Sequence, residues 1–156
     1  MEFRIATKED AALVLSFIRE LAEYEKMLDD VVATEQTVRE WVFDKGSAEV
    51  VFLLEEGKEV GFALYFHNFS TFVGRSGLYL EDLYVKPAYR GKGYGKALLQ
   101  YLAKLAVERG CGRFEWCCLD WNAPSIAFYR SLGARPMDEW TIYRVDGEAL
   151  LRLAGE

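Results

Sequence analysis

The stretch YRGKGYGKALL, Tyr89 to Leu99, places three glycines on alternate positions between an arginine and a run of helix formers. The apolar run before it, Leu78 to Val85, is typical of a strand, and Gly95 to Arg109 carries its apolar residues at helical spacing. The order strand, glycine loop, helix exposes consecutive backbone N–H groups at the positive end of a helix dipole. We therefore expect this loop to bind a pyrophosphate, with Lys92 and Lys96 adding positive charge at its rim.

Two familiar phosphate-binding motifs do not fit this loop. The Walker pattern needs a glycine where Arg90 stands, and Ser or Thr where Ala97 follows Lys96. The dinucleotide fingerprint needs a third glycine where Lys96 or Leu98 stands. A surface turn that uses glycine without binding anything is the structural alternative. The apolar strand before the loop, the long helix after it and the basic residues within it favour a binding loop.

The composition limits the class of protein. With 156 residues, 51% of them hydrophobic, the chain suits one domain with one core. A formal charge of −6 argues against a nucleic-acid backbone as the main partner and allows a cationic small molecule. No apolar run reaches membrane-spanning length, and the start, MEFRIATKEDAA, carries charges where a signal peptide needs an apolar stretch. We therefore expect a soluble cytoplasmic protein without a membrane partner.

The cysteines and the single histidine do not suggest a metal site or a disulfide framework. Cys117 and Cys118 are adjacent and lack the two-residue spacer of a zinc or redox pair, and Cys111 makes the number odd. We expect all three to be buried as small hydrophobic side chains. His67 has no partner at catalytic or metal-ligand spacing, and we expect it at the surface.

The periodicity of the whole chain predicts an α/β domain with a mostly antiparallel mixed sheet flanked by helices. The β-rich runs predict strands over Phe3–Ala6, Glu49–Leu54, Val60–Phe66, Leu78–Val85, Arg113–Leu119 and Trp140–Val145. Helices are expected from a capping box at Thr7 to about Met27, from Thr34, over Gly95–Arg109, from Pro124 to a stop at Gly133, and after Asp146. One passage, Leu78 to Leu119, has a βαβ-like order.

Three motifs occur in the order in which a known family carries them. They are the early ELAEYEKM, the segment YLEDLYVKPAYRGKGYG, in which Arg90, Gly93 and Gly95 match the family's cofactor loop, and the later LDWNAPSIAFYRSLGA. With these motifs the chain resembles the GNAT acyl-CoA-dependent N-acetyltransferases, and within them the spermidine/spermine (diamine) and thialysine N-acetyltransferase subfamily. The resemblance spans essentially the whole chain. It implies the GNAT fold, a single acetyltransferase domain over residues 1–156, acetyl-CoA as co-substrate, no metal, and a homodimer.

The resemblance also implies which residues hold acetyl-CoA. The loop would bind the pyrophosphate through Arg90, Gly91, Lys92, Gly93, Tyr94, Gly95 and Lys96. The strand residues Leu83, Tyr84 and Val85 would lie along the pantetheine arm, pairing with it as an added strand pairs with a sheet edge, and one of their amides would face the thioester carbonyl. The far side of the cofactor would contact Asn122, Ala123, Pro124, Ser125 and Tyr129.

The chemistry needs a proton donor and a proton acceptor. Attack of an amine on acetyl-CoA expels a thiolate, and the resemblance makes Tyr129 the candidate general acid. The amine must first lose a proton, because an alkyl ammonium has a pKa of about 10.4. Glu81 matches the subfamily's acidic substrate-site position and is the candidate base, directly or through a water; attraction of the cation without proton transfer is the alternative. Asp82, the next strand residue, should face the other side of the sheet unless a bulge intervenes, and we expect it to be a structural acid.

The resemblance places the amine near Tyr24, Glu25, Glu81, Glu115, Trp116 and Cys117. Spaced acidic groups along an aromatic wall suit a flexible polyamine, a diamine or a lysine-like cation. For Trp116 and Cys117 a role in the core is the alternative. The motif LDWN resembles the thialysine branch and NAPS resembles the polyamine branch, so the substrate stays open between the two.

Two other functions use the same sequence features. The domain could acetylate a protein N-terminus or a lysine side chain, which an open groove beside Glu25 would favour. It could also bind CoA without catalysis, as a sensor or an interaction module. The presence of both Tyr129 and Glu81 favours an enzyme over this last alternative.

Overall fold

The computed structural model describes residues 1–156, and its sheet has five strands in the order β1-β2-β3-β4-β5. The strands are β1 (Glu2–Ile5), β2 (Glu49–Glu55), β3 (Lys58–Ser70), β4 (Arg75–Val85) and β5 (Phe114–Trp116). Neighbours from β1 to β4 pair antiparallel, and β5 pairs parallel to β4. The predicted α/β class with a mostly antiparallel sheet is confirmed. The parallel pair is joined by a helix, as the βαβ-like order required.

The helices follow the predicted order. The α-helices are α1 (Ala11–Tyr24), α2 (Glu35–Val38), α3 (Tyr94–Glu108), α4 (Ala123–Ser131) and α5 (Gly147–Leu153). The shorter turns are η1 (Lys8–Asp10), η2 (Leu28–Asp30), η4 (Pro87–Tyr89) and the π-helical η3 (Arg39–Asp44), which continues α2. Each predicted helix is present within a few residues of its expected ends. None of them combines the length and the apolar character that crossing a membrane requires.

The chain divides into two compact units, residues 1–117 and residues 118–156. The first unit contains the whole sheet together with α1, α2 and α3, and the second contains α4 and α5. The sheet and its covering helices therefore belong to one unit, and the fold that positions the cofactor loop can be described within it.

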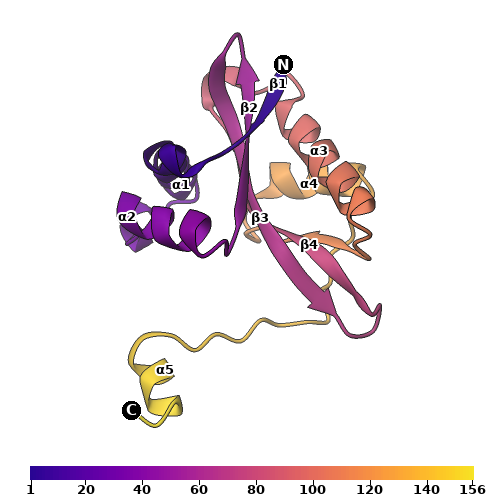
Figure 1. Cartoon of the computed structure of the whole chain (residues 1–156). Coiled ribbons are helices and arrows are strands. Elements are labelled where there is room, and N and C mark those ends of the chain that lie inside the picture. The colour runs from indigo at the N-terminus through magenta and orange to yellow at the C-terminus, as the bar shows by residue number, and fades with distance from the viewer. The chain divides into compact units, whose positions relative to one another are not determined.

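Helices cover both faces of the sheet in the first unit. α1 and α2 lie on one side of the sheet and α3 lies on the other, as Figure 1 shows. Phe17 of α1 packs against Phe52 and Phe62, with ring centroids 5.8 and 5.0 Å away. On α3, Leu98 and Leu102 are fully buried. Because the central strands are buried on both faces, β2 and the first half of β3 have continuous apolar sequences rather than alternating ones.

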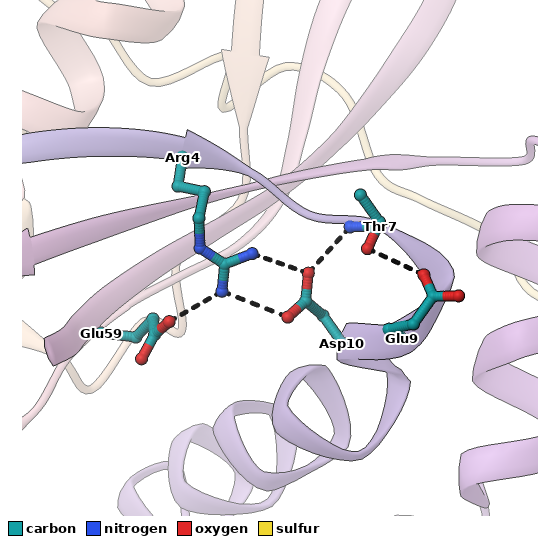
Figure 2. A network of polar contacts seen from close by, with 5 residues as sticks. All are labelled: Arg4, Thr7, Glu9, Asp10 and Glu59. Carbon is teal, nitrogen blue, oxygen red and sulfur yellow. Dashed lines mark hydrogen bonds and ion pairs between the residues drawn. The ribbon is translucent and has the colours of Figure 1, made fainter. Parts of the chain in front are cut away.

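A polar network fixes the start of α1 against the sheet, and Figure 2 shows its members. Arg4 on β1 donates from Nη1 to Oδ2 of Asp10 at 2.8 Å and from Nη2 to Oε1 of Glu59 at 2.7 Å. Asp10 Oδ2 also accepts the backbone N–H of Thr7, which completes the predicted capping box. The hydrogen bond from Arg4 holds the pKa of the Asp10 carboxyl below its usual value. The network thus joins β1, η1 and β3.

The prediction of a strand over Trp140–Val145 is wrong. The sheet ends at β5, and residues 141–145 are irregular and take part in no backbone hydrogen bond. Trp140, Ile142 and Tyr143 are exposed. These residue types favour strands, but a strand forms only where a partner pairs with its backbone. For the same reason β5, which pairs with β4 over three residue pairs, is shorter than the predicted Arg113–Leu119.

Candidate active site

The glycine loop adopts a backbone conformation that favours glycine at two of its positions. Gly91 and Gly93 have φ angles of 79° and 80°, in the left-handed region where a side chain would be strained. Gly93 is the N-cap of α3, and the N–H of Ala97 donates to its carbonyl at 3.0 Å. The backbone N–H groups of residues 91–96 donate no hydrogen bond within the chain. They are therefore open to an anion at the positive end of α3.

Gly95 has a different role in the loop. Its φ is not positive, and a Cβ built at this position would meet no atom within 4 Å. Neither backbone strain nor packing therefore requires glycine here. The missing side chain instead leaves the first turn of α3 accessible, which suits the close approach of a phosphate to the backbone.

Arg90 ties the glycine loop to the end of β4. Its Nε donates to the carbonyl oxygen of Val85 at 2.9 Å. Its guanidinium lies over the rings of Tyr24 and Tyr84, 5.1 and 5.2 Å from their centroids. Arg90 thereby connects the loop, the end of β4 and the end of α1. In this arrangement it positions the loop.

Lys92 is paired, whereas Lys96 is not. Nζ of Lys92 lies 2.9 Å from Oε1 of Glu55 at the end of β2, and the hydroxyl of Tyr94 donates to the same oxygen. The hydrogen bond from Tyr94 is the main reason that the pKa of Glu55 is lowered. Lys96 is exposed on the first turn of α3 and forms no ion pair. Of the two lysines expected at the rim, Lys96 is the one that offers an uncompensated charge.

β4 leaves one edge free next to the loop. β5 pairs with β4 only over Leu78–Leu80, whereas β4 continues to Val85. The N–H of Lys86 donates to the carbonyl of Val60 on β3 at 2.9 Å. By alternation along the strand, the backbone groups of Leu83 and Val85 point away from β3. This edge can pair with an extended chain that carries amide groups.

A β-bulge in β4 sets the direction of its acidic side chains. The neighbours Leu64 and Tyr65 on β3 pair with Asp82 and Leu80, respectively. Glu81, between Leu80 and Asp82, is the extra residue of the bulge. Asp82 shares a sheet face with its partner Leu64, which belongs to the core under α1. Because of this bulge, the side chains of the neighbours Glu81 and Asp82 need not point to opposite faces of the sheet.

Carboxyl groups from β4 and the end of α1 influence one another at this face. Burial is the main cause that raises the pKa of Asp82 to about 7, and the charges of Glu81 and Glu25 add to it. Burial also raises the pKa of Glu25, which directly follows α1. Glu81 itself is exposed. The face therefore combines negative charge with one carboxyl group that exchanges its proton near neutral pH.

The same face continues from β4 to β5. Tyr79 pairs with Glu115 across the two strands, and its hydroxyl lies 2.9 Å from Sγ of Cys117. The expectation that the cysteines are buried is wrong: Cys117, just beyond the end of the short β5, is exposed, and the other two are half-buried. Burial is the main cause that raises the pKa of Tyr79. Trp116 falls on the opposite face of β5 by strand alternation, and its ring centroid is 5.0 Å from that of Phe114. The strand thus separates Trp116 from its two predicted neighbours in the amine site.

The structure brings most of the predicted amine-site residues to the face under α1. Tyr24 and Glu25 lie at the end of α1, Glu81 on β4, and Glu115 and Cys117 on or next to β5. Tyr79 was not among the predicted site residues, and Asp82 was expected to be only a structural acid. Alternation alone could have found Tyr79, which stands two positions before Glu81. The orientation of Asp82 depends on the bulge, and no residue type in the sequence predicts a bulge at this position.

An open polar hollow flanks Glu25 in the first unit. Its lining comes from the last turn of α1 and from the turn that follows, with the residues Glu23, Lys26, Met27, Leu28, Asp29 and Asp30. Three of these six residues are acidic and one is basic. The hollow therefore has an excess of negative charge, which favours a cationic group.

The remaining predicted residues lie on or beside α4 in the second unit. Asn122 is buried, and its side-chain oxygen caps the helix by accepting the N–H of Ser125 at 3.4 Å. Pro124 occupies the first turn. Tyr129 is partly buried, and its ring centroid is 5.7 Å from that of Phe128. The candidate acid thus belongs to the second unit, while the glycine loop and the acidic face belong to the first.

Known proteins are similar to this chain over nearly its whole length. The family model described as Acetyltransferase (GNAT) family matches residues 15–134. The thialysine N-epsilon-acetyltransferase of Sus scrofa is 39% identical over 98% of this chain and 96% of that protein. The L-ornithine N5-acetyltransferase NATA1 of Arabidopsis thaliana is 32% identical over 94% of this chain and 85% of that protein. The solved structure of an integron cassette protein from V. cholerae has a TM-score of 0.82 and 32% identity, covering 99% of this chain and 98% of that one.

Proposed function

This chain belongs to the acetyltransferase (GNAT) family, and we propose that it transfers acetyl from acetyl-CoA to a primary amine of a small cationic substrate by direct attack in a ternary complex. One observation carries the proposal: the first unit holds the open amides of the glycine loop, the free edge of β4 and the acidic face under α1. The family match runs across the boundary between the two units. It supports treating residues 1–156 as one acetyltransferase domain.

The residues of the loop and of β4 fit acetyl-CoA. The amides of residues 91–96 would donate to the pyrophosphate, and Lys96 would add charge. The backbone of Leu83 and Val85 would pair with the amides of the pantetheine arm. Residues 122–125 at the start of α4 are proposed to contact the far side of the cofactor. When bound, acetyl-CoA supplies the acetyl group in activated form, as a thioester.

The acidic face is proposed to bind the amine. The carboxylates of Glu25, Glu81 and Glu115 would attract the ammonium groups, and Tyr24 would supply an aromatic wall. Since an alkyl ammonium with a pKa of about 10.4 is almost fully protonated at neutral pH, the bound substrate must lose a proton to this face before it can attack.

Tyr129 is proposed as the general acid. The reaction expels a thiolate, and a phenol within hydrogen-bond reach of the sulfur can give it a proton without an unusual pKa. α4 is capped at Asn122 and carries Tyr129 partly buried, which supports a fixed position for the ring.

A lysine-like amine is the leading substrate. The names of two relatives give thialysine and L-ornithine, which both carry a primary amine at the end of a short side chain. The three acidic groups of the face suit such a cation, and they suit a polyamine or a diamine as well. These three classes can be separated only by comparing their rates.

Release of coenzyme A tests the proposal. Purified protein would receive acetyl-CoA and one amine at a time from thialysine, lysine, ornithine, putrescine, spermidine, spermine and a basic peptide, and a thiol reagent would report the CoA formed. We expect rapid release with at least one small amine, and the preferred amine decides the substrate class. Silence with every amine, while acetyl-CoA still binds, would contradict an acetyltransferase of small amines and favour a CoA-binding module.

A second candidate function is acetylation of a protein N-terminus or of a lysine side chain. The open hollow beside Glu25 favours it, because the acidic residues there can hold a basic peptide next to the amine site. The peptide in the panel tests this alternative. It would lead if the peptide gives a higher kcat/KM than every small amine.

We also propose that the protein works in the cytoplasm as a homodimer, without a nucleic-acid or membrane partner. The net charge of −6 supports the absence of a nucleic-acid partner. The resemblance to the diamine and thialysine acetyltransferases supports the dimer. Light scattering on the purified protein should give twice the mass of one chain.

A further inference from the structure

The proton of the amine has two candidate acceptors on β4. The sequence favours Glu81, whose side chain is exposed, whereas the next residue, Asp82, is partly buried. This inference rests on the proposed acetyl transfer. We propose that Asp82 accepts the proton of the amine, and that Glu81 attracts the cation without taking its proton.

The bulge at Glu81 gives Asp82 its position. Asp82 pairs with Leu64, a member of the core under α1, so its carboxylate turns to the face where Glu25 follows α1. Asp82 also directly precedes Leu83, whose backbone lies on the free edge of β4. A proton acceptor at Asp82 is therefore one residue away from the edge along which the pantetheine arm and its thioester are proposed to lie.

The surroundings of Asp82 leave its carboxylate available to a proton. It accepts no hydrogen bond from the chain, and its partner across the sheet is the apolar Leu64. The charges that face it are both negative: Glu81 from β4 and Glu25 from the end of α1. Burial, together with these charges, raises the pKa of Asp82 to about 7. No cation of the chain neutralises it, so a substrate ammonium can fill that role.

The raised pKa suits the transfer. The equilibrium constant for proton transfer from an ammonium is roughly a thousandfold larger for a carboxylate with a pKa of about 7 than for one with the usual 3.8. A group that stays half deprotonated near neutral pH also remains able to accept. The position of Asp82 and its affinity for a proton therefore serve the same step.

The protons and electrons of the reaction balance with this assignment. The ammonium gives one proton to Asp82, and the lone pair that remains on nitrogen forms the C–N bond to the acetyl carbon. The C–S bond breaks with its electron pair on sulfur, and the sulfur takes a proton from Tyr129. The nitrogen then loses its second proton, which restores the Tyr129 phenol through solvent. Asp82 releases its proton to solvent, so one proton is produced for each acetyl group transferred.

Glu81 acts on Asp82 through its charge. Because the negative charge of Glu81 contributes to the raised pKa of Asp82, its removal should lower that pKa. Glu81→Gln should therefore shift the acidic limb of the rate profile to lower pH. Loss of a true base would instead remove the limb, so the two roles predict different profiles.

The test is the pH dependence of kcat/KM for the best amine, measured on the full chain and three variants. The wild-type acidic limb should lie near pH 7. Asp82→Asn should lower kcat/KM at pH 8 about a hundredfold and remove this limb. Glu81→Gln should lower kcat/KM less than about tenfold and shift the limb to lower pH. Asp44→Asn, an exposed aspartate at the end of η3, is the matched control and should keep the wild-type profile.

The outcomes separate this inference from the proposed function. If the wild type acetylates no amine, the proposed function fails. If it does so and Asp82→Asn retains the limb, Asp82 is not the acceptor. A direct titration protects against a variant that misfolds: the 13C carboxyl signal of Asp82 in the wild type should titrate near pH 7. Titration at the usual value of 3.8 would overturn the inference without any measurement of activity.

Discussion

At the scale of single residues, Tyr129 carries the sharpest prediction about chemistry. Tyr129→Phe removes the proposed proton donor and keeps the ring that lies beside Phe128. We expect kcat to fall about a hundredfold, the usual scale for a lost general acid, while the Kd for acetyl-CoA stays unchanged. Steady-state kinetics and calorimetric titration with acetyl-CoA would measure the two quantities. An unchanged kcat would remove Tyr129 from the mechanism.

Single residues also show which features of the site can be predicted from the sequence and which cannot. The glycine loop was expected from its residue types alone, and Gly91 and Gly93 have the positive φ angles that glycine tolerates, because this preference is local. The environment of Asp82 could not be predicted. Its pKa is raised mainly by burial, and then by the charges of Glu81 and Glu25. Burial and the approach of Glu25, which stands more than fifty positions earlier in the chain, both depend on the packing of α1 on the sheet.

At the scale of elements, substitutions in the glycine loop at the start of α3 can distinguish an effect on cofactor binding from an effect on stability. Gly95→Ala places a methyl group where the structure has open space, at a helical position where alanine is favoured by about 1 kcal/mol over glycine. The free energy of unfolding should therefore stay constant or rise. The Kd for acetyl-CoA should rise, because the methyl group stands over the amides proposed for the pyrophosphate. Urea denaturation and calorimetric titration measure both.

Gly93→Ala is the informative companion of that variant. Its φ of 80° would place alanine in a strained conformation, which costs about 1 kcal/mol. This variant should lose both stability and binding. If Gly95→Ala bound acetyl-CoA as tightly as the wild type, the loop would not hold the pyrophosphate.

The elements were predictable where their signals are local. Thr7 and Asp10 form the capping box that the sequence suggests, because both partners lie within one turn. The strand expected over Trp140–Val145 is absent, since pairing needs a partner that propensity does not supply. The bulge at Glu81 was foreseen only as a possibility, because register between β3 and β4 is set by the whole pair of strands.

At the scale of the whole molecule, stability at low pH depends on the network around Arg4. The pKa of Asp10 is lower in the folded chain than its ordinary value of 3.8, mainly through the hydrogen bond from Arg4. Its contribution is therefore present above pH 3.8 and is lost as the pH falls through the folded pKa. Asp10→Asn should lower the free energy of unfolding by about 1 kcal/mol at pH 7. In thermal melts the difference from the wild type should shrink as the pH falls below 3.8.

Asp82 should affect stability in the opposite direction. Its folded pKa of about 7 lies above the ordinary value, so its contribution is fully present below pH 3.8 and is lost as the pH rises through 7. Asp82→Asn should thus stabilise the fold at pH 8, by at most about 4 kcal/mol, and change little at pH 3. Urea denaturation of the wild type and of this variant at pH 8 and pH 3 measures the two differences in free energy of unfolding. Equal effects at both would show that burial of Asp82 has no energetic cost.

The bulge in β4 has a consequence for how this chain tolerates change. Upstream of Glu81 the odd-numbered side chains share the face under α1, and downstream of it the even-numbered ones do. A replacement at position 81 leaves this arrangement intact. Deletion of Glu81 would join Leu80 directly to Asp82, so the bulge would disappear while Asp82 stayed opposite Leu64. This is therefore the position at which β4 can lose a residue without turning the rest of the strand over, whereas a deletion at a regularly paired position would reverse every side chain beyond it.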